Sequence, residues 1–192
     1  MFVLGHLGIG SFLVARRVRA EQLVWLLLGT LLPDAIDKPL YYILVIVTGR
    51  RGADLGLISG SRTFGHTLLF AILFWLALPR RVGTPLFIGV ATHLALDELG
   101  DVAGALLPAL GTHGRPGTIN AILFPLLGPH FPISPYRSAL EHAASLGNGY
   151  VVAGEIVGAL LLLWQWRAGT FNGRTRRARA ERAASRSTPS SP

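Results

Sequence analysis

Long runs of apolar residues, separated by short polar or basic segments, make up most of the chain. A helix needs roughly 20 predominantly apolar residues to cross a bilayer, and this criterion predicts about five transmembrane or partly inserted helices. The predicted helices span about residues 2–15, 23–47, 64–78, 85–110 and 150–166. The pattern therefore predicts an all-α fold, that of a polytopic helical integral membrane protein.

Length and proline content limit some of these predicted helices. The first and third are shorter than a full crossing, so we expect them to tilt, to extend into flanking residues or to insert only partly. Pro33 and Pro39 in the second helix, and Pro108 in the fourth, are expected to break the helices that contain them. Broken helices are tolerated in a membrane where they line a cavity enclosed by protein. The prolines therefore favour an internal site.

The composition agrees with a membrane protein. Hydrophobic residues make up 51% of the chain and charged residues only 15%, and the mean hydropathy is +0.47. There is no cysteine, which excludes disulfides and thiolate metal sites, so any metal must be held by nitrogen and oxygen ligands. The 23 glycines form no nucleotide-binding fingerprint. They favour close packing between helices.

The net charge of +8 is concentrated near the C-terminus. From Arg167 onward the chain carries seven arginines and one acid, Glu181, which gives +6, whereas the preceding residues total +2. A basic segment after a last apolar helix is more typical of a cytoplasmic topology anchor than of a nucleic-acid site, so no nucleic-acid partner is expected. We predict a helical membrane domain with a metal site at residues 1–167 and a basic, disordered cytoplasmic tail at residues 168–192.

Basic residues on alternate connections predict the orientation in the membrane. With the N-terminus outside, residues 16–19, residues 80–81 and the tail all lie in the cytoplasm, whereas residues 50–51 lie outside and disagree. Positive charge follows the first apolar segment rather than preceding it, unlike in a cleavable signal peptide. We therefore expect a multi-pass protein of the inner (cytoplasmic) membrane.

Histidines and aspartates interrupt the apolar segments. An ionisable side chain inside a membrane is costly unless a partner, a proton or a cation compensates it, so these residues are candidates for a functional site. His93 and Asp97 are four residues apart and Asp34 and Asp37 three apart, so each pair shares a helix face. The predicted topology sets all the candidates in the outer half of the membrane or near its midplane, which favours one shared site. The candidate metal ligands are Asp34, Asp37, His66, His93 and Asp97, and His6 is expected at the same depth.

Histidine and carboxylate ligands suit one or two divalent cations, zinc best, with manganese or iron as alternatives. A bound metal lowers the pKa of its water and polarises a phosphoryl or carbonyl oxygen, while a further carboxylate takes the proton. Asp34, Asp37 and Asp97 are the candidate catalytic carboxylates. Arg62, four residues before His66, is a candidate substrate-binding clamp for an anionic phosphate. This is the chemistry of a hydrolase.

Four short segments carry a pattern in chain order: an early histidine, Leu-Pro-Asp-x-x-Asp, Arg-x-x-x-His-Thr and His-x-x-x-Asp. They are residues 5–6, 32–37, 62–67 and 93–97. The pattern resembles that of the membrane-bound metal-dependent hydrolases, also called the LexA-binding, inner-membrane-associated hydrolase or YdjM-type family. The resemblance implies a helical inner-membrane protein with hydrolase-like metal ligands, and it adds His6 to that set. It does not imply a substrate.

The predicted function is metal-dependent hydrolysis, phosphoesterase-like, of a membrane lipid or a lipid-linked phosphoester reached from the bilayer. One alternative is a cation- or proton-coupled transporter, because buried carboxylates and broken helices also build transport sites. Another is a non-catalytic membrane adaptor that keeps a metal for structure.

Purely structural interpretations of single residues also remain open. Asp37 could pair with Lys38, and His93 could bond Asp97 as a packing contact between helices. Glu155, near the outer end of the last predicted helix, could be a further ligand, a proton acceptor or a hydrogen-bonded structural acid.

Overall fold

The computed structural model describes residues 3–106, 118–136, 138–147 and 149–173. The regular elements within these ranges are all helical, which confirms the all-α fold class. A 3₁₀ turn between the second and third α-helices, η4 (Phe64–His66), belongs to the site described below. The α-helices are α1 (Val3–Val14), α2 (Leu23–Thr48), α3 (Leu68–Ala77), α4 (Arg80–Leu106), α5 (Thr118–Ile122), α6 (Ala139–Ala144) and α7 (Gly149–Arg167).

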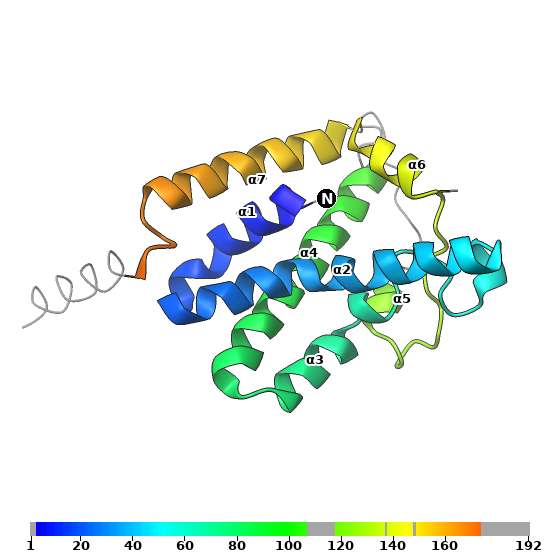
Figure 1. Ribbon diagram of the computed structural model, residues 1–192, viewed down its shortest axis with the longest axis horizontal. Coiled ribbons are helices and arrows are strands. Elements are labelled where there is room, and N and C mark those ends of the chain that lie inside the picture. The colour runs from blue at the N-terminus through cyan, green and yellow to red at the C-terminus, as the bar shows by residue number, and fades with distance from the viewer. Residues whose placement is uncertain (1–2, 107–117, 137, 148, 174–192) are drawn as a thin grey trace, which may run out of the picture.

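Two long helices, α2 and α4, pack against each other at the centre of the molecule (Figure 1). α1 packs on both of them, and α7 runs alongside α1. On the other side, α3 packs on α4, and η4 lies against α2. Each segment that carries predicted metal ligands therefore contacts the central pair.

Glycines allow the helix pairs to approach closely. A Cβ atom at Gly29 of α2 would overlap the backbone carbonyl of Leu86 in α4, and one at Gly89 would overlap the carbonyl of Leu26 in α2. Gly158 of α7 is in the same situation against α1. The prediction that the glycines serve close helix packing is confirmed at these crossings.

Gly89→Ala is expected to lower the free energy of unfolding by about 2 kcal/mol or more, because overpacking typically costs about 1–3 kcal/mol and the added atom here meets main chain that cannot rotate away. Thermal unfolding of the purified protein in detergent measures the effect. Gly147→Ala is the matched control, since no atom lies within 4 Å of a Cβ at that position. Equal midpoints for the two variants would contradict the close crossing.

The prediction that prolines break the second helix is wrong. α2 continues through both Pro33 and Pro39, and α4 continues through Pro85. A proline removes one helical hydrogen bond and crowds the preceding turn, but the bonds on either side hold the helix together, as in other long helices with internal prolines. Pro108 lies outside the described residues.

The chain turns sharply after α2 and returns along it. Gly49 ends α2 with a φ of 66°, a left-handed conformation that favours glycine, and its N–H donates to the carbonyl of Val45 at 3.0 Å. The third predicted helix is split into η4 and α3. Thr67 lies between them in an extended conformation, and its hydroxyl caps α3 by accepting from the Phe70 N–H at 3.0 Å. This split leaves η4 free to face α2.

Within the described residues, α7 alone is long and apolar enough to cross a membrane, and α3 is a shorter apolar helix. α2 and α4 have 26 and 27 residues, lengths that exceed the need for one crossing, but both carry the charged residues of the candidate site. The expectation of five membrane passes is therefore not confirmed and stays a prediction. Of the predicted tail, residues 174–192 lie outside the described residues.

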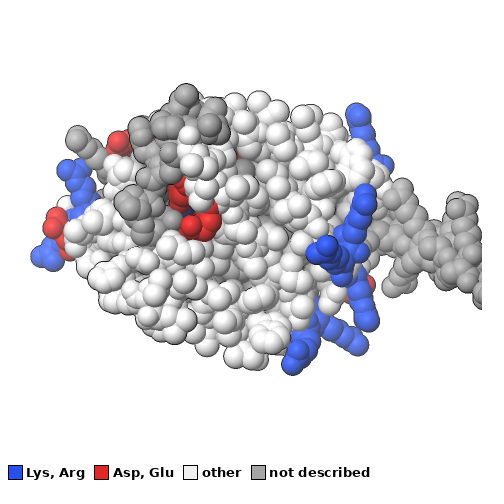
Figure 2. Space-filling view, turned by 180° about the vertical axis from the view of Figure 1, so that it is seen from behind, with Lys and Arg blue, Asp and Glu red and all other residues white. Residues whose placement is uncertain are grey.

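The outer surface carries many large apolar side chains. Ile46 is 81% exposed, Leu76 67% and Leu160 61%, and these residues lie on three different helices. Figure 2 shows uncharged side chains over the middle of the molecule and basic side chains mainly at its two ends. Soluble monomers rarely expose apolar surface on this scale, so the surface fits a membrane environment.

Candidate metal centre

Four separate elements bring all six predicted ligands together. His6 comes from α1, Asp34 and Asp37 from α2, His66 from η4, and His93 and Asp97 from α4. All are buried except Asp34, which is partly exposed. The six residues thus lie together in space, although they are up to 91 positions apart in the chain.

Hydrogen bonds orient both central imidazole rings. His93 Nδ1 lies 2.8 Å from the carbonyl oxygen of Thr30, and His66 Nδ1 lies 2.8 Å from Asp37 Oδ2. A carbonyl oxygen or a carboxylate can only accept, so each Nδ1 carries the hydrogen, and in the neutral ring each Nε2 keeps a lone pair. The two Nε2 atoms face each other 3.2 Å apart. Both are available to one cation, as in metal sites whose histidines are held by an outer hydrogen bond.

Two carboxylate oxygens flank this pair of nitrogens. Asp97 Oδ2 lies 3.6 Å from each Nε2. Asp34 Oδ1 lies 3.5 Å from His66 Nε2 and 3.9 Å from His93 Nε2. A tetrahedral zinc ion with bonds of about 2.0–2.1 Å separates its ligand atoms by roughly 3.3–3.4 Å. The separations among His66 Nε2, His93 Nε2 and Asp97 Oδ2, 3.2–3.6 Å, are close to that value, so these three donors fit a single divalent cation. Asp34 Oδ1, 3.9 Å from His93 Nε2, lies farther out.

His6 lies beneath His93. The two rings stack with centroids 3.8 Å apart and planes 17° from parallel, and His6 Nε2 lies 3.3 Å from Asp97 Oδ1. His6 is fully buried, and neither of its ring nitrogens makes a hydrogen bond within the described part of the chain. Leaving a buried polar atom unbonded is costly, which makes His6 a possible ligand as well.

Two overlapping groups could hold a metal: His66 with His93 and Asp97, and His6 with Asp34 and His93. Both groups need His93. Because the Nδ1 of His93 is bonded to Thr30, this residue offers one lone pair and serves one ion at a time. The geometry therefore favours one ion over two ions that share His93.

Asp37 bonds to η4 and to the Nδ1 of His66, on the side of that ring away from its Nε2. Its Oδ2 accepts from the backbone N–H of Thr63 at 2.7 Å and of His66 at 3.2 Å, and its Oδ1 accepts from Gly65 N–H at 2.9 Å. The ring of His66 also bonds to Oδ2, so both oxygens are hydrogen-bonded. Asp37 is the only candidate whose position suggests orientation of a ligand rather than contact with the metal. It pairs with η4, whereas Lys38 pairs with Asp34 at 2.6 Å.

Arg62 pairs with the same oxygen of Asp97 that lies beside the two imidazole nitrogens. Its Nε lies 3.1 Å from Asp97 Oδ2 and its Nη1 2.6 Å from Asp101 Oδ2. Burial lowers the pKa of Arg62, but the charges of Asp97 and Asp101 outweigh this effect and hold the pKa above its ordinary value. The guanidinium is therefore always charged. Its third nitrogen, Nη2, has no bonded partner among the residues that the structure describes.

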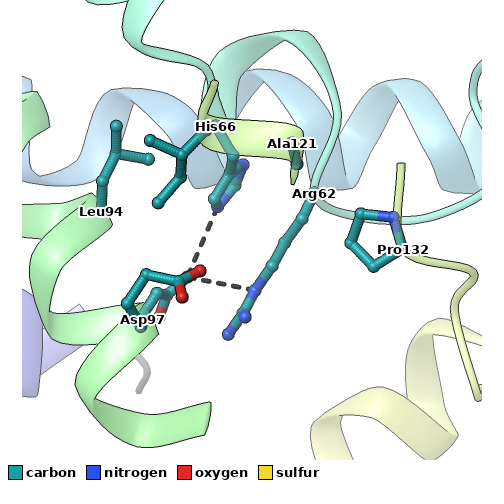
Figure 3. A pocket seen from close by; sticks show the side chains of 8 residues that line it. Arg62, His66, Leu94, Asp97, Ala121 and Pro132 are labelled. Atoms are coloured by element: carbon teal, nitrogen blue, oxygen red, sulfur yellow. Dashed lines mark ion pairs between the residues drawn. The ribbon is translucent and has the colours of Figure 1, made fainter. Parts of the chain in front are cut away.

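A pocket opens beside Asp97 and Arg62. Figure 3 shows Asp97 paired with both His66 and Arg62, with Leu94 and Pro132 on opposite sides. Its lining residues are Arg62, His66, Leu94, Asp97, Glu98, Ala121, Ile122 and Pro132. The pocket is thus bordered by two candidate ligands, His66 and Asp97, and by Arg62, the predicted anion clamp.

Sequence reasoning missed three participants. The Thr30 carbonyl has no side-chain signal and could not have been found. Asp101 lies four residues after Asp97, so the same helical spacing that paired His93 with Asp97 could have indicated it. Glu98 follows Asp97 directly and lines the pocket.

Glu155, which the sequence left open, has a structural role. Its carboxylate accepts from the N–H groups of Leu4 at 3.0 Å and Gly5 at 2.9 Å, at the first turn of α1. A carboxylate at this position satisfies free amide donors and complements the helix dipole. Glu155 therefore fixes α1, and with it His6, against α7.

The family model described as YdjM inner membrane protein matches residues 1–169. The chain belongs to this family. The match confirms the resemblance seen in the four sequence segments and extends it through α7. Membership in the YdjM family supports an inner-membrane location. Neither the curated proteins nor the solved structures contain a match to the chain.

Proposed function

We propose that this member of the YdjM family is a metal-dependent hydrolase that acts on a phosphoester at the membrane. The observation that carries the proposal is the pair of Nε2 lone pairs, of His66 and His93, held 3.2 Å apart beside Asp97. Two histidines and one carboxylate around an open position are the ligand set of many catalytic zinc sites. Zinc is the cation that this set fits best, with manganese or iron as alternatives.

When bound, zinc would lower the pKa of a water molecule and polarise a phosphoryl oxygen. The chain's own groups have separate tasks. The Thr30 carbonyl and Asp37 hold the two rings so that their lone pairs converge. Asp34 presents Oδ1 beside both nitrogens, and its side chain is 17% exposed against 7% for Asp97. We assign Asp34 Oδ1 as the acceptor of the proton from the attacking water.

Arg62 serves the same reaction in two ways. Its Nε positions Asp97, and its Nη2 can donate to an anionic oxygen in the pocket. The pocket joins this charged group to apolar side chains, and the protein belongs to an inner-membrane family. These observations support a lipid or lipid-linked phosphoester as substrate.

The proposed topology has five passes, the N-terminus outside, the tail in the cytoplasm and the site towards the outer face. Its support is the larger of the two groups of basic side chains, which gathers at one end of the molecule (Figure 2). Arg16 lies over the ring of Trp164 at 5.8 Å, and the Arg81 carbonyl accepts from Gln22 at 3.2 Å, so three connections share that end. A reporter fused to the tail and reached from outside the cell would contradict this orientation.

Metal removal tests the proposed function. Protein purified in detergent is expected to hold about one equivalent of zinc by elemental analysis, and chelation is expected to lower phosphoester hydrolysis at least about 100-fold, with recovery when zinc returns. Hydrolysis that survives complete chelation would overturn the metal-dependent reaction. Zinc binding without any hydrolysis would instead indicate the non-catalytic adaptor.

A further inference from the structure

Asp101 is a carboxylate near the candidate metal centre that the proposed reaction does not use. It follows Asp97 by four residues on α4, so both side chains leave the same face of the helix. The Asp101 side chain is only 16% exposed. A charge with so little access to water is costly unless a partner of opposite charge compensates it. That partner is Arg62.

Arg62 contacts Asp101 more closely than it contacts Asp97. Its Nη1 donates to Asp101 Oδ2 at 2.6 Å, a short hydrogen bond between two charged groups. Its Nε lies 3.1 Å from Asp97 Oδ2, in the ion pair that Figure 3 shows. Asp101 is therefore the firmer anchor of the guanidinium group.

One positive charge thus serves two negative charges. The guanidinium group contributes +1 and the carboxylates of Asp97 and Asp101 contribute −2, so the three groups together carry −1. Opposite charges attract strongly where water has little access. Without Asp101, Arg62 and Asp97 would form a neutral one-to-one pair, and such a pair attracts a cation less strongly than this group of three.

The oxygen that Arg62 contacts also lies beside the two imidazole rings. Asp97 Oδ2 is 3.6 Å from the Nε2 of His66 and 3.6 Å from the Nε2 of His93. A guanidinium group and a divalent cation therefore compete for the charge of the same oxygen atom. A second carboxylate that holds the guanidinium group shifts this competition towards the cation.

We propose that Asp101 is a positioning residue of the metal centre, which holds Arg62 and shares its charge so that Asp97 Oδ2 stays available to a divalent cation. The inference rests on the proposed function, from which it takes zinc as the cation. Asp101 itself does not contact the ion. It acts through Arg62, as the outer partners of metal ligands do in other sites.

Zinc affinity tests this role, measured on the full-length protein in detergent by competition with a chromophoric chelator. Asp101→Asn keeps the size of the side chain and removes its charge, and it is expected to weaken zinc binding about 10–100-fold. Asp54→Asn is the matched control, because Asp54 is exposed in a 3₁₀ turn, and it is expected to keep the wild-type affinity. A purely structural role of Asp101 would lower the thermal midpoint and leave the zinc affinity of the folded protein unchanged.

A double-mutant cycle separates action through Arg62 from direct attraction between Asp101 and the ion. Arg62→Gln keeps a polar side chain without the charge. In this background Asp101→Asn is expected to change the zinc affinity by less than about threefold, because the competing guanidinium group is gone. An equal loss of affinity in both backgrounds would mean that Asp101 acts on the ion directly, and it would overturn the inference.

Asp101→Glu covers the case in which Asp101→Asn does not fold. It retains the charge, so its zinc affinity is expected to stay within about threefold of wild type, and a loss of more than about tenfold would refute the inference. Wild-type affinity in a folded Asp101→Asn protein would refute it as well and leave the hydrolase intact. If the wild-type protein binds zinc but hydrolyses no phosphoester, the hydrolase fails and the affinities alone decide the inference. A wild-type protein that binds no zinc would overturn both.

Discussion

His93→Ala is expected to abolish metal binding and to lower phosphoester hydrolysis by more than about 100-fold. His93 is fully buried, belongs to both groups that could hold a metal, and has its single lone pair aimed at His66 Nε2. Loss of an outer hydrogen-bond partner of a ligand typically weakens a site about 10–100-fold, so loss of the ligand itself should exceed that range.

Elemental analysis and the rate of phosphate release measure this effect. His130→Ala is the matched control, because His130 is exposed in the segment after α5 and makes no contact with the candidate ligands. Since an alanine at a buried position also leaves a cavity, His93→Gln serves as a second variant that retains most of the side-chain volume. A folded His93→Gln protein with wild-type zinc content would refute the assignment.

Asp37→Ala is expected to lower the free energy of unfolding by about 3–5 kcal/mol. The carboxylate is fully buried, and it accepts from the backbone N–H groups of Thr63, Gly65 and His66 in addition to the His66 ring. Each buried donor left without a partner costs about 1–3 kcal/mol. The same change frees the His66 ring, so zinc affinity should fall about 10–100-fold in any protein that remains folded.

Thermal unfolding in detergent and zinc titration measure the two effects of Asp37→Ala. Asp54→Ala is the control, because Asp54 is exposed in a 3₁₀ turn of the same connection. Asp37→Asn retains one acceptor oxygen and should fall between wild type and Asp37→Ala in stability. A wild-type midpoint for Asp37→Ala would mean that η4 does not depend on this carboxylate.

The site shows where sequence reasoning reached its limit. The spacing of His93 and Asp97 correctly placed both on one helix face, because four residues make about one turn. The same argument applied to Asp34 and Asp37 was incomplete. Asp34 Oδ1 lies near the imidazole nitrogens, whereas Asp37 turns to the amides of residues 63–66. Helical spacing could not anticipate which partners a distant connection would bring to each carboxylate.

The role of Arg62 shows the same limit. Its charge and its position before His66 indicated an anion clamp, but the structure joins it first to Asp97 and Asp101. Only the nitrogen without a bonded partner remains for a substrate. The sequence could identify Arg62 as a candidate, and the fold gives two of its three nitrogens to Asp97 and Asp101.

By itself, the sequence determined the helical class, the apolar surface and the chemical types of the candidate ligands, because these depend on composition and on periodicity along short segments. Tertiary structure alone decided which atom each ligand presents. For His93, the choice depends on the Thr30 carbonyl, which faces its ring because α2 and α4 cross closely at Gly29 and Gly89. For His66, it depends on η4, which folds back onto Asp37. These contacts join backbone groups, which carry no signal of their own in the sequence and meet only when the helices pack.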